Sequence, residues 1–488
     1  MLPSGMIFTH SGMALLGEPR HILTRLAVMN SRAYLGLLNL LMPRGSDGTQ
    51  GMKFELGYVR KIPMPRSIDQ QDLADHLNEQ ARVAVVDARR RFKDRETSSH
   101  FVGPLSLGSG QTLGQCLDST LARTVELQRE ISNRMQAIDE LVATAYSLSD
   151  SDMETLQSAV MSHEEIAEVP PAHDELLRDL QLWFVGVVFG RWDVRIALDP
   201  SLAVKLGDPF APIPVCSPAT LVRSDGLPAR RNGIASKEWM KARSDATMLP
   251  LEGSVRSPTI PDSEYPLSMD WDGILVDDPD HPDDIVRRIR EVLELLWGER
   301  ADTIEVEACE ILGVKGLRAF FRNPRMFFDH HIKRYSKSRR KAPIYWLLQS
   351  PKRSYGMWLY YQRLDPDILF KALTRYVEPK IRLEEGRLEE FEDRRRSVGT
   401  GGREGRQAER AVEKQEEFIA DLREFHDRLE QAAKLYLRPD LNDGVLLNIA
   451  PLHELVPWKE AKTKWNELLA GKYEWSSIGK QLREKGIV

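Results

Sequence analysis

The sequence predicts a mixed α/β protein that is mainly helical, and three patterns support this prediction. Residues 117–146 and 284–297 repeat apolar side chains at the spacing of an amphipathic helix. Residues 378–437 are mostly Glu, Arg, Lys and Leu, and they include apolar side chains in alternating steps of four and three, which is typical of a coiled coil: Phe418, Leu422, Phe425, Leu429 and Ala432. Segments with the composition of strands are short, and the clearest pair, Tyr345 to Leu348 and Tyr355 to Tyr361, predicts an aromatic β-hairpin.

The composition excludes several classes of protein. A chain of 488 residues is too long for one hydrophobic core, so several packed units are expected. The hydrophobic fraction of 42% and the charged fraction of 29% are ordinary for a globular protein, and no apolar run approaches the roughly 18 residues of a membrane span. Residues 1–12 lack the basic start and apolar stretch of a secretory signal, so a cytoplasmic protein without a membrane partner is expected.

The cysteine spacing and the net charge disfavour three kinds of chemistry: disulfide bonds, zinc binding and nonspecific polyanion binding by the whole chain. Cys116, Cys216 and Cys309 lie far apart in the sequence, which fits neither a disulfide framework nor a zinc site, so we expect reduced core residues. The net charge of −5 argues against nonspecific polyanion binding by the chain as a whole. Local basic segments therefore matter more than the sum.

The first hundred residues predict a helix packed beside a strand. Residues 21–42 carry leucines at helical spacing and are followed by glycine and proline, which predicts a helix and then a loop. Residues 52–60 alternate apolar and polar side chains and run into Pro63 and Pro65, which cannot continue a ladder. We interpret them as a strand.

The next segments predict helices and one insertion. Residues 117–146 predict a long amphipathic helix, and the polar residues 147–152 can cap a helix that follows. Residues 182–192 are nearly all apolar but too short to span a bilayer, so they predict a buried helix whose glycines permit close approach. Residues 217–262 are rich in Ser, Pro and Gly and predict a long irregular insertion.

The carboxy-terminal half predicts a capped helix and a helical hairpin. Residues 284–297 have one apolar face and follow Asp283 and Asp284, a typical start signal for a helix. The coiled-coil pattern of 378–437 is interrupted at 397–406 by glycines that disfavour a helix. These features predict an antiparallel helical hairpin with a flexible tip.

The strongest chemical signal is a basic and aromatic segment. Residues 317–341 contain nine Lys or Arg against one acid, with phenylalanines and Tyr335 interleaved, and the density is highest at 333–341. Clustered Lys and Arg neutralise phosphates and supply most sequence-independent affinity for DNA. The alternative is a solvated charged face beside a phenylalanine core. A second basic run, residues 89–93, leaves the same two interpretations open.

Two motifs resemble catalytic signatures but depart from them. Gly108 to Gly110 with Gly114 is glycine-rich, but no hydrophobic strand precedes it, so it is not interpreted as a nucleotide loop. Residues 323–326 begin like the Asn-Pro-Pro-aromatic motif that grips the target amine of a flipped base, but Arg325 replaces the second proline. We therefore assign no catalytic residue here.

Two further clusters are interpreted as structural. The five aspartates of residues 277–284, with His281, could imitate a cation site, but a polar loop that caps the helix at 284 explains them without a metal. His330 and His331 are adjacent and so point in different directions, which disfavours a shared ligand role. We expect no metal site.

Several segments of the chain, taken in order, form a recognisable set of motifs. They are residues 35–39, 54–63, 138–146, 185–192, 328–346, 443–452, 458–459 and 471–475. Taken together, the motifs resemble one family, the PglX-like adenine-specific DNA methyltransferases of BREX and DISARM phage-defence systems, which are related to type IIG restriction-modification enzymes. The individual motifs are moderately specific, and their order is more specific than any one of them. The similarity covers most of the chain apart from about residues 217–262.

The resemblance implies a function for the chain. Members of the family transfer a methyl group from S-adenosylmethionine to the exocyclic amine of adenine in a short DNA site. The cofactor and catalytic motifs of the family lie upstream of every matched segment, so no catalytic or cofactor-binding residue is assigned in this chain. The expected partners are double-stranded DNA, a methyltransferase core in a missing N-terminal part or a separate subunit, and other defence proteins.

Within this resemblance the chain is interpreted as the DNA-binding and specificity portion of such an enzyme. The alternative is a non-catalytic scaffold of a defence complex, favoured by the net negative charge and the long hairpin. The expected DNA-binding residues, with Tyr335 stacking or packing, are Lys333, Arg334, Tyr335, Lys337, Arg339, Arg340 and Lys341. The expected organisation is the end of a target-recognition domain at 1–110, a helical spacer at 111–200, a mixed α/β domain at 201–376 that contains the insertion and the basic segment, an antiparallel coiled-coil hairpin at 377–437 and a helical segment at 438–488.

Overall fold

A computed structural model describes most residues of the chain. They are residues 19–41, 56–93, 95–98, 101, 103–104, 107, 112–159, 171–199, 202, 221–222, 234–235, 265–267, 272–337, 340–399 and 401–488. The chain forms two compact units. Unit 1 comprises Met1–Ser109, Cys116–Ala172 and Ala203–Val255, and unit 2 comprises Gly110–Gln115, His173–Leu202 and Arg256–Val488.

Unit 1 is built mainly from helices. Its core gathers apolar side chains such as Leu38, Leu77 and Val142, which are at most 2% exposed. Two short strands pair antiparallel within the predicted insertion. The elements are α1 (Pro19–Asn30), α2 (Arg32–Leu41), α3 (Leu56–Val59), the 3-10 turn η1 (Arg66–Asp69), α4 (Gln71–Phe92), α5 (Leu113–Tyr146), α6 (Asp150–Ala159), β1 (Leu221–Val222) and β2 (Ile234–Ala235).

The single helix predicted at residues 21–42 is two helices that meet at Ser31. The Ser31 hydroxyl is buried, donates to the Val28 carbonyl at 2.6 Å and accepts from the Tyr34 amide at 3.2 Å. Asp139 of α5 accepts a further hydrogen bond from the Arg32 amide at 2.7 Å. Ser31 and Asp139 thus satisfy the amides that the start of a helix leaves without partners.

The prediction of a strand at residues 52–60 is wrong for the described residues 56–60. Leu56–Val59 form the helical turn α3, and residues 52–55 lie outside the described part of the chain. Tyr58 and Val59 pack against the core of unit 1, and the Tyr34 hydroxyl donates to the Val59 carbonyl at 3.1 Å. An isolated strand would need a ladder partner, whereas a helical turn satisfies its own backbone.

The predicted long helix and the cap after it are confirmed. Helix α5 covers the predicted 117–146, and α6 begins three residues after the left-handed Ser147. Ser149 and Asp152 bond reciprocally: the Ser149 amide donates to the Asp152 carboxylate at 2.9 Å, and the Asp152 amide donates to the Ser149 hydroxyl at 3.2 Å. This is a capping box that fixes the start of α6.

Unit 2 combines helices with a small antiparallel sheet. Its first half contains α7 (His173–Val188), α8 (Val194–Leu198), β3 (Ile274–Val276), α10 (Ile285–Trp297), η5 (Gly298–Arg300), α11 (Ala301–Leu312), α12 (Leu317–Arg322), α13 (Phe327–Arg334), β4 (Ser336–Lys337), β5 (Arg340–Lys341), β6 (Tyr345–Gln349), β7 (Gly356–Tyr360) and η6 (Tyr361–Arg363). Its second half contains α14 (Ile368–Lys371), the π-helical turn η7 (Ala372–Val377), α15 (Glu378–Val398), α16 (Gly402–Lys434), η8 (Leu441–Asp443), α17 (Val445–Ile449), η9 (Ala450–Leu452), α18 (Lys459–Leu469) and α19 (Ser477–Glu484).

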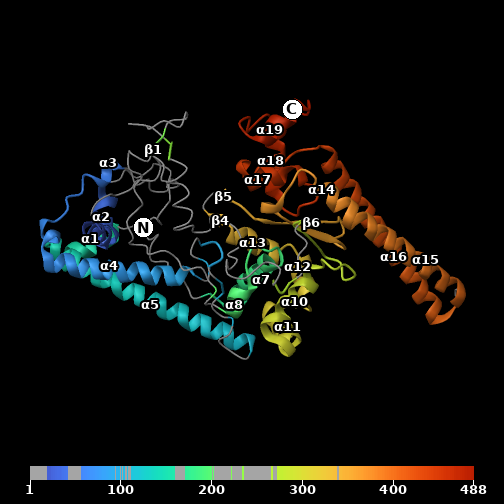
Figure 1. Cartoon of the computed structure of the whole chain (residues 1–488), viewed down its shortest axis with the longest axis horizontal. Coiled ribbons are helices and arrows are strands. Elements are labelled where there is room, and N and C mark those ends of the chain that lie inside the picture. The colour runs from blue at the N-terminus through green and yellow to red at the C-terminus, as the bar shows by residue number, and fades with distance from the viewer. Residues whose placement is uncertain are drawn as a thin grey trace. The chain divides into compact units, whose positions relative to one another are not determined.

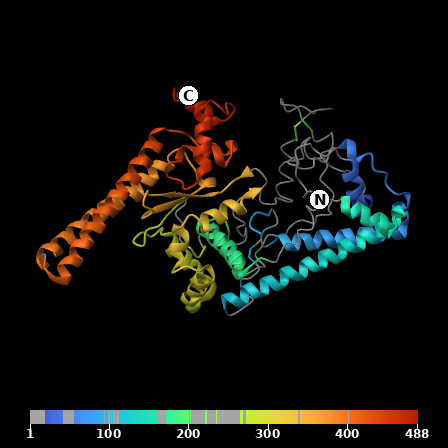
Figure 2. The same ribbon diagram turned by 180° about the vertical axis from the view of Figure 1, so that it is seen from behind.

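The sheet of unit 2 has the strand order β3-β7-β6, and all its neighbours are antiparallel. The β6–β7 pair confirms the predicted aromatic hairpin, with Trp346 opposite Leu359. Helices α7, α10, α12 and α13 lie on one side of the sheet, and α17 to α19 lie toward the other (Figures 1 and 2). Trp346 and Trp358 are each 1% exposed, so both faces of the hairpin are buried.

Helix α7 (His173–Val188) confirms the buried helix predicted at residues 182–192 as far as Val188, and residues 189–192 lie beyond its end. Ten of its residues are buried, from Leu177 to Val188. A Cβ added to Gly186 would lie 2.3 Å from Cδ1 of Trp192 and 2.9 Å from the hydroxyl of Tyr345. The absence of a side chain at Gly186 therefore lets α7 contact the sheet, as the glycine was predicted to do.

The predicted antiparallel helical hairpin is confirmed as α15 and α16, which pack along each other and extend away from the sheet in Figures 1 and 2. The non-helical tip is shorter than predicted, since α15 continues to Val398 and α16 starts at Gly402. Gly399 and Gly402 have φ angles of 75° and 81°, in the left-handed region that glycine adopts without strain.

Two of the three cysteines lie in the core of the described chain. Cys116 and Cys309 are free and buried, as predicted, whereas Cys216 lies outside the described residues. Across the described part of the chain, no helix has the length and apolar character needed to cross a membrane.

Candidate nucleic-acid interface

The basic segment 317–341 rests on a buried aromatic layer. Phe320, Phe321, Phe327 and Phe328 are each at most 1% exposed, and Phe327 contacts the Trp358 ring edge-on at 5.1 Å between centroids. Burying such rings stabilises α12 and α13 against the sheet by roughly 2 kcal/mol each. The polar sides of α12 and α13 are thereby fixed in direction.

The arginines of α12 face the acidic loop that was weighed as a cation site. Arg318 donates to both oxygens of Asp284 at 2.8 Å and also to Asp277, and Arg322 donates to Asp277 at 2.5 Å. Asp284 caps α10 by accepting from the Arg287 amide at 3.0 Å, which confirms the predicted capping role. Among the described residues, no group of three or more His, Cys, Asp or Glu side chains is arranged to hold a metal.

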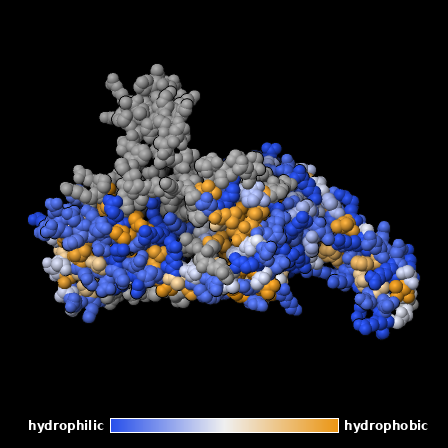
Figure 3. Space-filling view, turned by 60° about the horizontal axis from the view of Figure 1, so that its bottom comes forward, coloured by the Kyte–Doolittle hydropathy of each residue, from blue (hydrophilic) through white to orange (hydrophobic). Residues whose placement is uncertain are grey.

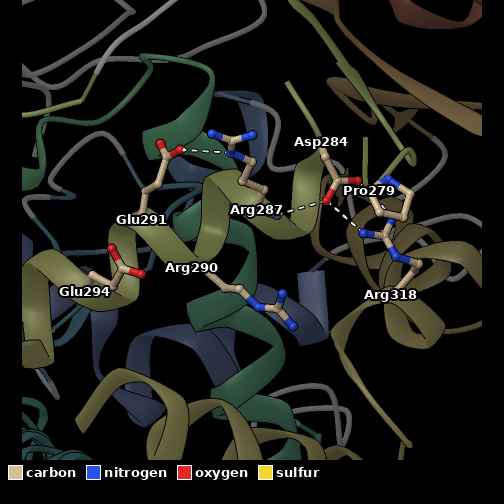
Figure 4. A pocket seen from close by; sticks show the side chains of 7 residues that line it. All are labelled: Pro279, Asp284, Arg287, Arg290, Glu291, Glu294 and Arg318. Atoms are coloured by element: carbon tan, nitrogen blue, oxygen red, sulfur yellow. Dashed lines mark hydrogen bonds and ion pairs between the residues drawn. The ribbon is translucent and has the colours of Figure 1, made fainter. Parts of the chain in front are cut away.

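An open pocket lies beside this network, and Figure 4 shows its lining. Arg287 approaches Glu291 at 3.8 Å, and Arg290 forms a bidentate pair with Glu305 at 2.7 and 2.8 Å. Each lining arginine therefore already contacts a carboxylate. The side chains that line the pocket are Pro279, Asp284, Arg287, Arg290, Glu291, Glu294 and Arg318.

Two side chains of α13, those of His330 and Arg334, bond to α7. Asp179 accepts from His330 Nε2 at 2.8 Å and from Arg334 Nε at 2.7 Å. Burial alone would raise the pKa of Asp179, but the bonds from His330 and Arg334 outweigh it and lower that pKa below its usual value. Arg334 also lies 3.6 Å from Glu175. A predicted DNA-contacting arginine is thus partnered within the fold.

The side chains of His330 and His331 point in different directions, as predicted, and the side chain of His331 lies in the core. Its Nε2 accepts from the Ile344 and Tyr345 amides at 2.8 and 3.0 Å, and its Nδ1 is buried without a partner among the described residues. Burial, together with the nearby charges of Arg191 and His330, lowers the pKa of His331 well below 6.5. The ring is therefore neutral at physiological pH and joins α13 to the start of β6.

Tyr335 closes α13 and packs against a cation from another element. The Arg191 guanidinium donates to the Tyr335 hydroxyl and lies 5.4 Å from its ring centroid. Its ring also contacts His331 at 4.6 Å between centroids. Of the two roles predicted for Tyr335, these contacts are those of a packing residue.

Lys333 and the short strands β4 and β5 carry the remaining predicted residues. Lys333 is exposed on α13. Strands β4 and β5 pair antiparallel with Lys337 opposite Arg340, and Lys341 forms an ion pair with Glu460 of α18. Arg339 lies outside the described residues.

The second basic run, residues 89–93, ends helix α4. Arg90 lies 3.3 Å from Asp87, whose carboxylate is 1% exposed and also accepts from Arg134 of α5 at 2.7 Å. Arg91 lies over the Phe92 ring at 6.0 Å. This run belongs to unit 1 and supports the contact between α4 and α5.

Residues 323–326, which begin like the Asn-Pro-Pro-aromatic motif, form the turn between α12 and α13. The Asn323 side chain accepts from the Arg325 amide at 3.1 Å, and Pro324 is buried. Gly108 to Gly110 lie outside the described residues, and Gly114 lies in α5.

Sequence reasoning missed the acidic partners of the basic segment. Asp179 is 155 residues from Arg334, and Glu460 is 119 residues from Lys341. It also missed a set of arginines at the tip of the α15–α16 hairpin, at residues 394–410. These arginines are visible in the sequence, but their position at one end of the hairpin is not.

Comparison with known proteins finds similarity to two adenine-specific methyltransferases. The chain is 23% identical over 482 residues to adenine-specific methyltransferase BrxX of Escherichia coli O9:H4 (strain HS), covering 93% of this chain and 34% of that protein. It is 23% identical over 470 residues to adenine-specific methyltransferase PglX of Lacticaseibacillus casei (strain Zhang), covering 92% and 32%. No model of a known protein family matches the chain.

These comparisons confirm the resemblance to PglX-like proteins as distant homology to a portion of such a protein. The similarity extends over nearly the whole chain, as the ordered motifs predicted. The chain spans about a third of the length of the curated relatives it matches.

Proposed function

We propose that this chain is the DNA-binding and specificity portion of a site-specific adenine DNA methyltransferase of a phage-defence system, either BREX, DISARM or restriction-modification. The observation that carries the proposal is the similarity to two adenine-specific methyltransferases along more than nine-tenths of the chain. In this proposal a methyltransferase core from another part or subunit binds S-adenosylmethionine and performs the transfer.

Within the basic segment we assign two roles, contact with DNA phosphates and anchoring of the segment to the rest of the fold. Lys333 is exposed on α13, and we propose that it contacts phosphates together with the predicted residues Lys337, Arg339 and Arg340, of which Lys337 and Arg340 are paired in register in the β4–β5 ladder. Arg334, Tyr335 and Lys341 hold the segment through Asp179, Arg191 and Glu460. Phosphate contacts of this kind set the position of a protein on duplex DNA without reading its sequence.

The loop from β3 to α10 leads from a buried strand into a helix, which is where many cofactor-binding loops lie. It carries aspartates where such loops carry glycines, and Arg318 and Lys380 occupy its carboxylates. It does not fit S-adenosylmethionine, and no cofactor contact is assigned to it.

Binding of the purified chain to a 30-base-pair duplex across a salt series tests the proposal. Replacing Lys333, Lys337 and Arg340 with alanine should reduce the magnitude of the slope of log K against log salt by about 2 to 3, since each phosphate contact contributes about 0.9. The matched control replaces Lys315, Arg363 and Lys459 with alanine. Wild-type chain that is folded and does not bind DNA at low salt would contradict the proposal.

A second candidate is a non-catalytic assembly subunit of a defence complex. The α15–α16 hairpin favours it, because a long projecting hairpin with many charged side chains suits contact with another protein. Absence of DNA binding, combined with capture of a purified methyltransferase core by the hairpin, would favour this candidate over the first.

A further inference from the structure

The α15–α16 hairpin carries its charges in two separate zones. Its tip, residues 394–410, has six arginines and two glutamates. Its stalk, residues 378–393 and 411–434, has 14 acidic and 7 basic residues. A strongly basic end therefore sits on an acidic support.

The tip arginines lie close to one another in space. They come from the last turn and a half of α15 and the first two turns or so of α16, which meet at the end of the hairpin (Figure 1). At about 1.5 Å per residue, all of them lie within roughly 12 Å of that end. The six are Arg394, Arg395, Arg396, Arg403, Arg406 and Arg410.

Most of this positive charge has no acidic partner among the residues that the structure describes. Arg396 pairs with Glu392 and Asp393 at 3.0 Å. Within the described part of the chain, Arg394, Arg403 and Arg410 are exposed and form no ion pair. Like charges held this close together destabilise the bare hairpin slightly, which is the arrangement expected where an anionic ligand supplies the missing charge.

The base of the hairpin is tied firmly to the rest of unit 2. The buried Lys380 ammonium donates to Asp278 at 2.6 Å and to Asp280 at 3.1 Å, and it lies 2.8 Å from Glu384. On α16, the Asp421 carboxylate accepts from the Ser350 hydroxyl at 2.6 Å and from the Lys352 amide at 2.8 Å. The tip is thus held in a defined position relative to the sheet of unit 2.

The surface chemistry favours a nucleic acid over a membrane or an acidic protein. Hydrophilic side chains dominate the projecting hairpin in Figure 3, with scattered apolar ones, whereas interfacial membrane binding needs an apolar face. Arginine forks bind phosphate through two parallel bonds, and duplex DNA carries one charge per about 1.7 Å. The acidic stalk would repel DNA from the sides, so the end of the hairpin remains as the contact surface.

We propose that the tip of the α15–α16 hairpin is a second contact for the phosphates of duplex DNA, separate from Lys333 and the β4–β5 strands. This inference rests on the proposed function, because it assumes that the chain acts on DNA. The tip grips the backbone at a distance from the β4–β5 contact and so lengthens the footprint of unit 2 on the duplex.

The test compares duplex binding by three forms of the full chain across a salt series. The tip variant carries Arg394→Gln, Arg403→Gln and Arg410→Gln. The stalk control carries Arg382→Gln, Arg423→Gln and Lys434→Gln, which removes the same charge from side chains that are 60–66% exposed and already paired. The tip variant should reduce the salt slope by about 2 to 3 and shorten the hydroxyl-radical footprint, and the control should do neither.

The outcomes separate this inference from the proposed function. A tip variant that binds like wild type, while the Lys333, Lys337 and Arg340 variant is weakened, would overturn the tip contact and leave the proposed function standing. Failure of folded wild-type chain to bind DNA would overturn both. A different anionic partner would also overturn the tip contact. This result would appear if the chain binds vesicles containing 30% phosphatidylserine, or polyglutamate, and the tip substitutions weaken that binding while leaving DNA binding unchanged.

Discussion

Unit 2 contains two arginine-rich regions that look alike in sequence and differ in the fold. In residues 317–341 the arginines meet carboxylates from distant parts of the chain, such as Asp284 with Arg318 and Asp179 with Arg334. At the hairpin tip, residues 394–410, most arginines project into solvent. We infer from this difference that a basic run favours polyanion binding only where the fold leaves its charges without acidic partners.

The largest effect expected from this difference is on stability at Asp284. The Asp284→Ala change leaves Arg318 without its bidentate partner and removes the cap of α10, and Asp284 is 1% exposed. The unfolding free energy should fall by about 3 to 5 kcal/mol, as when one partner of a buried pair is removed. Urea unfolding measures it, and Glu299→Ala at an exposed site should change the free energy by less than about 0.5 kcal/mol. A loss below 1 kcal/mol at Asp284 would mean that the pair is not structural.

A smaller effect is expected at His331 as the pH changes. The folded pKa of His331 lies below its unfolded value of about 6.5, so the unfolded chain binds the proton first as the pH falls. Stability should therefore decrease from about pH 6.5 downward, by at most about 1.4 kcal/mol per pH unit from this group. His331→Gln should flatten that slope between pH 7 and 5. An unchanged slope would show that His331 is not the responsible group, and His453, whose pKa burial also lowers, would be the next to test.

A third prediction concerns Arg334, which is partly exposed. Its side chain and that of Asp179 are 32% and 28% exposed, so solvent weakens the pair relative to that of Arg318. Arg334→Ala should lower the unfolding free energy by about 1 kcal/mol, with Arg334→Lys intermediate. If Arg334→Ala leaves stability unchanged and weakens DNA binding as much as Lys333→Ala does, Arg334 contacts DNA directly and the anchoring role is wrong.

The smallest stability effect is expected at the tip. Arg394→Gln, Arg403→Gln and Arg410→Gln remove exposed charges that form no ion pair within the described chain, so each should change the unfolding free energy by at most about 0.5 kcal/mol. Thermal and urea unfolding of the triple variant would check this. A loss of several kcal/mol would show that the tip arginines hold the hairpin together and are not available to a ligand.

Local patterns predicted much of the fold because they reflect contacts within one element. The helices α5 and α10, the β6–β7 hairpin and the α15–α16 pair follow from periodicity and capping. The break at Ser31 and the helical turn at Leu56–Val59 depend on contacts with Asp139 and Tyr34. Such contacts lie far apart in sequence and leave no local signal.

The candidate site was harder to predict for the same reason. The density of charge at residues 317–341 is a property of the sequence, but its neutralisation depends on Asp179, Asp277 and Asp284. The tip arginines flank the glycine-containing interruption at residues 397–406, and nothing in the sequence shows that they meet at one end of a hairpin. Only the hairpin geometry separates the end of the helices from their sides.

We expect the exposed Lys333 and tip arginines, together with the predicted residues Lys337 and Arg340, to bind DNA, while the ion-paired cations hold the fold. The salt dependence of duplex binding by one combined variant tests this expectation. The variant replaces Lys333, Lys337, Arg340, Arg394, Arg403 and Arg410 with glutamine and keeps every ion-paired arginine described above. Its salt slope should be smaller than that of wild type by up to about 5, at about 0.9 per phosphate contact, with the unfolding free energy nearly preserved. A folded variant that retains the full wild-type slope would contradict the account.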